Sequence, residues 1–592
     1  MLLQRFLLLL GLIYCSAVRA QLNPAPGDTL NFTQIMFEHP AIKEVEYYKL
    51  QIIERGKDSL FRHPLIEITD SAPAVLIDKF EFGKKYLWRY TAVSKGKNTR
   101  WEGPYSFEVM NEDSLNKHRF RIFVLQNDKG INMGGLILLD CNTVAYDRTG
   151  KAVWYLHFNV TKPGANPPVR DLRISNAGTV TYLFGKDAIE SNLKGKELWR
   201  APQRDADMDE RPVARRELYH HDFKRLDNGD YMVLAGLVTN RKLPAYIDTS
   251  KINRGSKPNA RPFYIKNIDG SLHATVSIGT IVEFDKAGKI VWQWNSNNYF
   301  TDEDLFPRGT DLGQPLEERD THLNAFSVDE QNKFVYAGFR NISRIIKIDK
   351  QTGKVVYSWG NKSLSGEAGD GRGFFWRQHD AHILADGSIA VFNNNIPEVK
   401  TSSVVIFSQH EGKDSSKIIW TLDCNLDSVV KAKSMVGGNV DELPNKNLLI
   451  CTGNSDRIFE ITRDKQMVWH AIGGRKTIND TSATPYPLYR AHYVSSLYPC
   501  YFALQQIKEA NAGELRFKIF NTGTEKDIYE VANEDHEDGH TSRTETAEVP
   551  AGSWLIYTPE QRHAGSAEGA IKISVRSKKN PDLVKYIELT AE

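Results

Sequence analysis

The sequence lacks several features that would assign it quickly to a class of protein. Beyond the N-terminal residues, no segment approaches the roughly 20 apolar residues of a membrane-spanning helix. A dominant charge is also missing, because 76 basic and 74 acidic residues leave a net charge of +2, which argues against a nucleic-acid partner. Cysteine is scarce, with five in 592 residues. We therefore expect a small-molecule partner, with no nucleic acid and no membrane.

The N-terminus predicts export. Residues 1–20 contain one basic residue, Arg5, then an apolar run, and small residues at Val18 and Ala20, which together are typical of a cleavable signal peptide. A lipoprotein cleavage at Cys15 is a weaker alternative, because Tyr14 stands where a small residue is wanted. We expect a secreted or periplasmic protein. An oxidising compartment could pair the four remaining cysteines in three ways: Cys141, Cys424, Cys451 and Cys500.

A repeat runs through the middle of the chain, which is too long for a single core. Each copy is a short alternating segment, a turn with Gly or Asp, and a second segment that ends in an aromatic residue. The copies begin at Asn142, Gly279, Ser343, Ser403 and Asp456, with a worn sixth copy that ends in GKELW at 195–199. Each is preceded by another predicted hairpin, so the unit has four strands.

Six four-stranded units predict an all-β protein with a six-bladed β-propeller. The alternation and turns on either side are typical of immunoglobulin-like or fibronectin-type β-sandwiches. The predicted domains are a signal peptide at 1–20, an N-terminal β-sandwich at 21–112, the propeller at 113–497 and a C-terminal β-sandwich at 498–592.

The repeat also aligns basic residues. In three first hairpins the turn glycine lies eight positions after Arg170, His221 and His379. The fourth unit is one residue longer and lacks the glycine, but aligning its Thr-His pair with His220-His221 puts His322 at the same point. The first strand of a blade is innermost, so we expect these side chains to converge at one mouth of the channel.

The second strand of each hairpin returns to the same mouth. It brings Arg340 near His322, and the Asn393–Asn395 run to the fifth unit. Asn324 lies two residues after His322 and therefore shares its strand face. His382, three residues after His379, is expected on the opposite face.

Different chemistries remain open for such a cluster. A single histidine at a strand start is more often structural, but three in register with two arginines are harder to explain by packing, because a buried unpaired arginine is costly. Three histidines also suit zinc. Arg170 and Arg340 would repel a dication and favour an anion such as a sulfate or phosphate ester. We expect no metal and no cofactor.

At these residues the sequence resembles the bacterial arylsulfate sulfotransferases, periplasmic enzymes that do not use a nucleotide sulfate donor. The matching phrases are HHDFKRLDNGDYMVL, DTHLNAF, FRNISRIIKID with YSWG, and FWRQHDAHILADGSIAVFNNN. They span the predicted propeller. The resemblance implies a six-bladed propeller that moves a sulfuryl group from a phenolic sulfate ester to a phenol, in a ping-pong mechanism through a sulfohistidine.

The resemblance also implies roles for single residues. His379 matches the nucleophile, His221 and His322 match two supporting histidines, and Arg340 matches a sulfate-binding arginine. Asn324 matches another residue of the pocket. His220 is the alternative to His221, and the repeat register favours His221. Arg170 joins the substrate-binding set through the repeat alone.

The chain also departs from the family. Gly338 and Phe339 stand where the family usually has Ser-Ser, and the C-terminal domain is not typical of it. The natural donor and acceptor, the role of that domain and the subunit arrangement stay open, with a homodimer among the arrangements considered. The alternatives in function are a secreted propeller that binds anionic or sulfated ligands, and a metal-dependent hydrolase or lyase.

Overall fold

The computed structural model is built almost entirely of β-strands, which confirms the all-β prediction. Within its described residues the short α-helices are α2 (Glu112–Leu115) and α3 (Asp302–Leu305), and the 3₁₀ turns are η2 (Thr249–Lys251), η3 (Ser296–Asn298) and η5 (Gly453–Ser455). The structure describes residues 22–58, 60–116, 120–157, 169–203, 219–251, 265–306, 308, 321–329, 331, 333–395, 401–410, 415–426, 433–476, 483–485, 488–507, 515–533, 544–559 and 571–589. The predicted signal peptide and the Cys15 alternative lie outside these ranges. No described helix has the length and apolar character needed to cross a bilayer.

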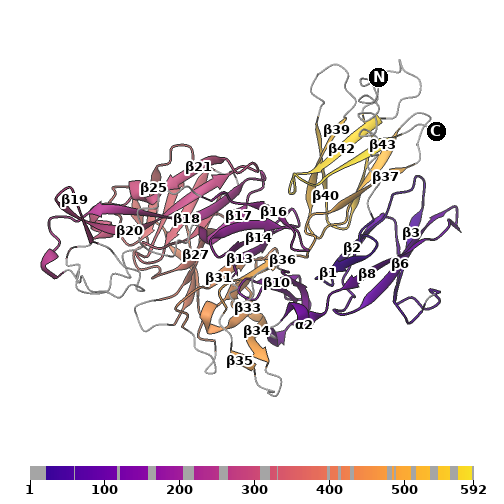
Figure 1. Cartoon of the computed structure of the whole chain (residues 1–592), viewed down its shortest axis with the longest axis horizontal. Helices are drawn as coiled ribbons and strands as arrows, with labels where there is room; N and C mark the ends of the chain where they lie inside the picture. The colour runs from indigo at the N-terminus through magenta and orange to yellow at the C-terminus, as the bar shows by residue number, and fades with distance from the viewer. Residues whose placement is uncertain are drawn as a thin grey trace, which may run out of the picture.

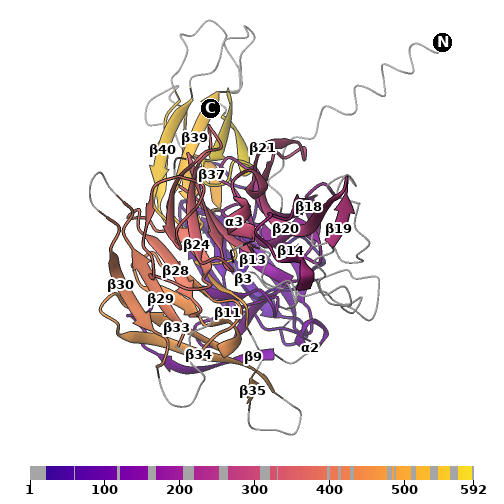
Figure 2. The ribbon, with the colours of Figure 1, turned by 90° about the vertical axis from the view of Figure 1, so that its left-hand side faces the viewer.

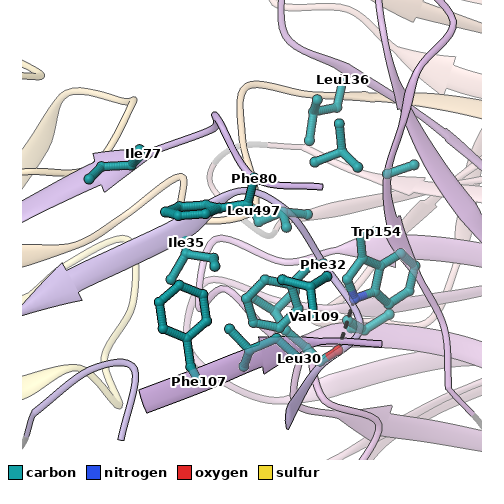
Figure 3. Packing of buried hydrophobic residues seen from close by; sticks show 14 of the residues in the cluster. Leu30, Phe32, Ile35, Ile77, Phe80, Phe107, Val109, Leu136, Trp154 and Leu497 are labelled. Atoms are coloured by element: carbon teal, nitrogen blue, oxygen red, sulfur yellow. Dashed lines mark hydrogen bonds between the residues drawn. The ribbon is translucent and has the colours of Figure 1, made fainter. Parts of the chain in front are cut away.

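The N-terminal region contains two sheets. The larger has the order β1 (Asp28–Leu30), β8 (Glu102–Val109), β6 (Lys85–Ser94), β3 (Tyr47–Glu54) and β4 (Ile66–Asp70), with β7 (Lys97–Asn98) on β6. The smaller pairs β2 (Ile35–Glu38) with β5 (Ala74–Ile77). Their core continues into the middle of the chain, as Figure 3 shows for Phe80, Phe107 and Trp154. The indole of Trp154 donates a 2.9 Å hydrogen bond to the carbonyl of Leu193.

The middle of the chain forms six sheets in its described part, here numbered 1 to 6 (Figure 1). Sheet 1 has the order β12 (Ala152–Tyr155), β11 (Val144–Asp147), β10 (Leu136–Leu139), β36 (Ala491–Val494). Sheet 2 has β13 (Val169–Ile174), β14 (Val180–Phe184), β15 (Asp187–Ser191), β16 (Glu197–Arg200). Sheet 3 has β17 (Tyr219–Arg225), β18 (Tyr231–Lys242), β20 (Ser271–Phe284), β21 (Ile290–Asn295), with β19 (Ile265–Ile268) on β20.

The next three sheets follow the same plan. Sheet 4 has β22 (Leu323–Val328), β23 (Phe334–Phe339), β24 (Arg344–Asp349), β25 (Val355–Gly360), β26 (Gly369–Asp370). Sheet 5 has β27 (His379–Ile383), β28 (Ile389–Asn393), β29 (Ser403–Phe407), β30 (Ile418–Asp423). Sheet 6 has β31 (Asn439–Glu442), β32 (Leu448–Cys451), β33 (Arg457–Ile461), β34 (Met467–Lys476), β35 (Ala483–Pro485), and β9 (Phe120–Asn127) on β34.

The repeated sequence phrase explains the outer hairpins. In sheet 1, the Asp147 carboxylate accepts backbone N–H groups from Thr149 and Lys151 at 2.8 and 3.0 Å. Gly150 closes the turn with φ +86°, a conformation that glycine adopts without steric cost. Apolar residues on both sides alternate into the core. Each Asp-to-Gly-Lys phrase therefore encodes a tight antiparallel connection.

Hydrophobic cores join each sheet to the next. Separate clusters connect sheets 1 and 2, 2 and 3, 3 and 4, 4 and 5, and 5 and 6, and another connects sheet 6 back to sheet 1. Figure 2 shows the neighbouring strands of sheets 5 and 6 in orange. Strand β36, from far along the chain, pairs with β10, so sheet 1 takes strands from both ends of the repeat. The six sheets thus form a closed cycle of packing.

The C-terminal region, yellow in Figure 1, contains two further sheets. One has β37 (Phe502–Ile507), β38 (Arg516–Asn521), β41 (Trp554–Tyr557), and the other has β40 (Glu545–Val549), β39 (Asp527–Asn533), β42 (Ile571–Ser577), β43 (Val584–Leu589). Lys585 forms an ion pair with Glu38 of the N-terminal region, and Asp582 pairs with Arg225 and Lys286 of sheet 3. Cys141, Cys424, Cys451 and Cys500 are free thiols.

Candidate functional site

Apart from Arg340, which directly follows the second strand of sheet 4, the predicted site residues lie on or beside the first strands of sheets 2 to 5, at β-bulges. In β13 and β27, Arg170 and His379 are the last paired residues before a bulge. His220 and His221 lie inside the bulge of β17, whereas His322 directly precedes β22. Bulges re-aim side chains and are frequent near active sites.

The expectation that these residues share one strand register is therefore wrong in detail. The bulge contains two residues in β13 and β27, three in β17 and one in β22. Each extra residue shifts the pairing between the first and second strands. Residues at the same sequence distance from the turn glycine therefore do not occupy equivalent positions in the four sheets. The bulge also puts His382 on the same face of β27 as His379, because their partners on β28, Phe392 and Ala390, are two residues apart. Simple alternation along a strand would place them on opposite faces.

Two of the histidines have strained backbones. His221 has φ +63° and His322 has φ +57°, in the left-handed region that is uncommon for residues other than glycine. Such conformations cost about 1–3 kcal/mol and cluster at functional sites. The surrounding sheets must hold both residues in place.

The histidine rings are in contact. The centroids of His221 and His322 lie 4.9 Å apart with nearly perpendicular planes, and His220 packs against His221 at the same centroid distance. The Nδ1 atoms of His220 and His221 are 2.8 Å apart, so one of them donates to the other. Both candidates thus belong to the cluster, with His221 between His220 and His322.

His379 is nearly inaccessible, with 2% of its surface exposed. Its Nδ1 lies 2.7 Å from the Asn394 side-chain oxygen, and its Nε2 faces the backbone N–H of Gly437 at 3.4 Å. Burial lowers the pKa of His379 to about 3, with Arg340 and His322 lowering it further and the Asn394 hydrogen bond opposing them. Its imidazole is therefore neutral near pH 7.

His221 is also uncharged in the free protein. Burial lowers its pKa well below the ordinary value, and the charges of His322, His220, His379 and Arg170 add to this shift. An imidazolium at His221 therefore needs a bound anion to raise that pKa. In the free site the fixed positive charge comes from the arginines.

Arg340 is tied to the same cluster. Its backbone N–H donates to the His322 carbonyl at 2.9 Å, and its guanidinium donates to the Asn341 side chain and the Met435 carbonyl at 2.9 and 3.2 Å. Asn324 is fully buried and donates to the Gln378 carbonyl at 2.9 Å. Its side-chain oxygen has no hydrogen-bond partner within the described residues, which leaves a buried acceptor.

Tyr489 is a site residue that the sequence reasoning missed. The Arg170 guanidinium lies 4.2 Å from the centre of its ring, and the ring meets His379 edge-on at 6.2 Å. Burial raises the pKa of Tyr489 to about 12, and within the described residues its buried hydroxyl has no hydrogen-bond partner. Tyr489 belongs to no repeat phrase and precedes the closing strand β36.

A buried ionic network supports the cluster. Arg490 is fully buried, donates to Asp171 at 2.9 Å and to Asp222, and also donates to the Asn324 carbonyl at 3.1 Å. These carboxylates link successive first strands, because Asp171 accepts the Phe223 backbone N–H at 2.7 Å. Asp222, Asp380 and Asp441 do the same toward Phe326, Val440 and Tyr493.

The sequence held a signal for this network. An aspartate directly follows Arg170, His221 and His379, so the recurring pair is a basic residue and Asp. Within the described residues, no group of three or more His, Cys, Asp or Glu side chains is placed to hold a metal ion.

Comparison with known proteins gives one family. A family model described as Arylsulfotransferase (ASST) matches residues 266–431. No curated protein matches the chain. Similar solved structures include a protein of unknown function from Bacteroides caccae, at 14% identity over 60% of this chain and 93% of that chain, with a TM-score of 0.32. A catalytically inactive virginiamycin B lyase from Staphylococcus aureus, with quinupristin, has 10% identity over 68% and 96%, with a TM-score of 0.30.

TM-scores this low do not establish a shared fold. The matched segment includes His322, Arg340 and His379, whereas Arg170 and His221 lie before it. The match over residues 266–431 therefore confirms the resemblance of this segment to the arylsulfate sulfotransferases.

Proposed function

We propose that the protein transfers a sulfuryl group from a phenolic sulfate ester to a phenol, in two steps through a sulfohistidine at His379. The observation that carries this proposal is a buried, neutral imidazole whose Nδ1 contacts an amide oxygen and which lies within the electrostatic reach of Arg340 and His322. A neutral imidazole is a nucleophile, and the adjacent guanidinium of Arg340 suits an anionic donor. The chemistry requires no cofactor.

Both half-reactions balance on these groups. In the first, the imidazole lone pair of His379 forms an N–S bond while the S–O bond to the aryl group breaks, and its electron pair leaves on the phenolate oxygen. In the second, the oxygen of the acceptor phenol attacks sulfur, and the N–S electron pair returns to the imidazole. The acceptor proton passes to a base of the cluster.

The other cluster residues stabilise charge on the transferring group. Arg340 and Arg170 would neutralise the nonbridging oxygens, as in phosphoryl transfer, where catalysis is mainly positioning and charge stabilisation. A bound sulfate ester would raise the pKa of His221 and let it or His322 protonate the leaving phenolate. Because a phenol has a pKa of about 10, this proton transfer is undemanding.

We also propose the finer architecture. The closed cycle of six sheets and the β10–β36 pairing support a six-bladed propeller, and the paired sheets at each end support flanking β-sandwiches. Export to the periplasm or outside the cell rests on residues 1–20 alone. A homodimer is the assembly to test by light scattering.

Steady-state kinetics test the function. With an aryl sulfate donor and a phenol acceptor, we expect parallel double-reciprocal lines at different acceptor concentrations, which is the signature of a ping-pong mechanism. Binding of the ester without turnover would instead support a binding module and overturn the proposal.

Removing metal ions tests the hydrolase or lyase alternative. Dialysis against a chelator is expected to leave the transfer rate unchanged, because the proposed nucleophile and charge stabilisers are side chains. The measurement is the initial rate before and after dialysis, with metal content determined on the same sample. A rate that falls on chelation and returns with added metal would contradict the mechanism.

The pH dependence follows from the lowered pKa of His379. A histidine with a lowered pKa stays neutral until the pH falls to that value. We therefore expect kcat/KM to fall only near about pH 3. The acid limb of kcat should lie higher, because the bound anion raises the pKa. The profile is measured over the range in which circular dichroism is constant. An acid limb of kcat/KM at the ordinary histidine pKa of about 6.5 would contradict the assignment.

A further inference from the structure

We propose that Asn394 is the positioning residue that fixes His379 in the tautomer with the proton on Nδ1, which makes Nε2 the nitrogen that takes the sulfuryl group. The role in transfer rests on the proposed function, whereas the tautomer is a property of the free protein. Asn394 directly follows β28 and is fully buried.

The orientation of the Asn394 amide is determined by its neighbours. Its side-chain nitrogen donates to two carbonyl oxygens, those of Ser434 at 3.0 Å and Gly437 at 3.1 Å. A flipped amide would place its own oxygen against both carbonyls, where neither side has a proton to share. The amide oxygen therefore faces His379.

This orientation determines the proton on His379. An amide oxygen can only accept, so at 2.7 Å the Nδ1 atom of His379 must donate. A neutral imidazole has a single N–H, and its other nitrogen, Nε2, then carries the lone pair. The pKa of about 3 means that the ring is neutral near pH 7.

A second contact points the same way. The backbone N–H of Gly437 points at Nε2 from 3.4 Å, an orientation that favours a lone pair over a proton on that nitrogen. This distance is beyond the usual range for a hydrogen bond, so the lone pair stays available to an electrophile. Gly437 is at φ +72°, and an added Cβ would lie 2.7 Å from the Tyr489 carbonyl. Glycine is therefore required at 437 both by this φ and by the Tyr489 backbone beside it.

The segment that carries these carbonyls is itself anchored. The Ser434 backbone N–H donates to the Ser402 hydroxyl at 2.8 Å, and the Ser434 hydroxyl donates to Asn454 at 2.8 Å. Asn454 also accepts the backbone N–H of Met435 at 2.9 Å. Hydrogen bonds with Ser402 and Asn454 thus hold the segment whose carbonyl groups orient Asn394.

The arrangement favours the transfer step. When the Nε2 lone pair forms the N–S bond and the aryl oxygen takes the S–O electron pair, the ring becomes cationic and keeps its proton on Nδ1. The hydrogen bond from Nδ1 to Asn394 then becomes charge-assisted and strengthens as the transition state forms. No proton has to move at Nδ1 in either half-reaction.

The test compares Asn394→Leu with Asn361→Leu. Asn361 is the control, because its half-buried side-chain amide donates to the Ile342 carbonyl at 2.9 Å rather than contacting a site histidine. In ¹⁵N-labelled wild type, we expect NMR to show His379 protonated on Nδ1 alone. Asn394→Leu should shift the ring toward the Nε2–H tautomer and lower kcat by about 10²- to 10⁴-fold, with KM changed by less than about threefold. Asn361→Leu should change neither.

A second variant keeps the test informative if the leucine variant does not fold. Asn394→Asp retains an acceptor for the Nδ1 proton but adds a negative charge, so the pKa of His379 rises and the acid limb of kcat/KM should move up by about 1–3 pH units. A residue with only a structural role would not move this limb.

The outcomes separate the two claims. An Nε2–H tautomer in the wild type, an unchanged kcat in folded Asn394→Leu, or an unmoved acid limb in Asn394→Asp would each overturn the role of Asn394. An Nδ1–H tautomer in a protein that never acquires a sulfuryl group would leave the positioning correct and refute the proposed function.

Discussion

Replacing His379 with asparagine is expected to reduce aryl sulfate turnover by about 10⁴- to 10⁶-fold, the loss seen when an enzyme loses its nucleophile. An asparagine can hydrogen-bond to Asn394 or Gly437, but its amide nitrogen has no lone pair that can attack sulfur. The residual rate would reflect binding and charge stabilisation alone. The measurement is the release of the phenol from an aryl sulfate.

A histidine outside the cluster is the control for this variant. His273 lies in β20 and contacts the Ser271 carbonyl at 3.1 Å. His273→Asn should keep the wild-type rate to within about threefold. Unchanged turnover in His379→Asn would refute the mechanism, whatever the control shows.

Replacing Arg340 with methionine is expected to lower kcat/KM for the donor by about 10²- to 10³-fold, as for other charge stabilisers of a transition state. The Arg340 guanidinium is the cation that most strongly lowers the pKa of His379, so a sulfuryl group on His379, as proposed, would lie within its electrostatic reach. Arg340→Lys keeps the charge but not the planar fork, so its loss should be smaller than that of the methionine variant.

The exposed Arg372 gives a matched control for charge. It lies in the connection between sheets 4 and 5, and Arg372→Met removes the same charge from the protein. Its kcat/KM should match that of the wild type. Equal losses in both methionine variants would mean that net charge, rather than a specific contact of Arg340, assists the reaction.

The sequence predicts the strand units well, because alternation and Asp-to-Gly turns are local. The first unit is the exception. Its phrase at Val144–Tyr155 supplies β11 and β12, but the strands beside them are β10 and β36, and β36 comes from residues 491–494. Pairing between such distant segments leaves no local pattern.

Most members of the cluster were predicted, Tyr489 being the exception, but its geometry was not. Turn-glycine spacing identified His221 and His379, whereas the bulges that aim them have no local signature. The sequence placed Asn394 at the mouth of the channel but did not predict its role. That role depends on contacts with residues 434–437, which come from a separate segment of the chain. The departure at Gly338 has a packing explanation, since a Cβ there would lie 3.1 Å from that of Ala381.

Mass spectrometry of the protein incubated with an aryl sulfate, without acceptor, tests the central claim most directly. We predict the mass of one sulfuryl group on the peptide that contains His379, lost on addition of a phenol and absent from His379→Asn. A sulfuryl group on another residue, or none while turnover proceeds, would contradict the account.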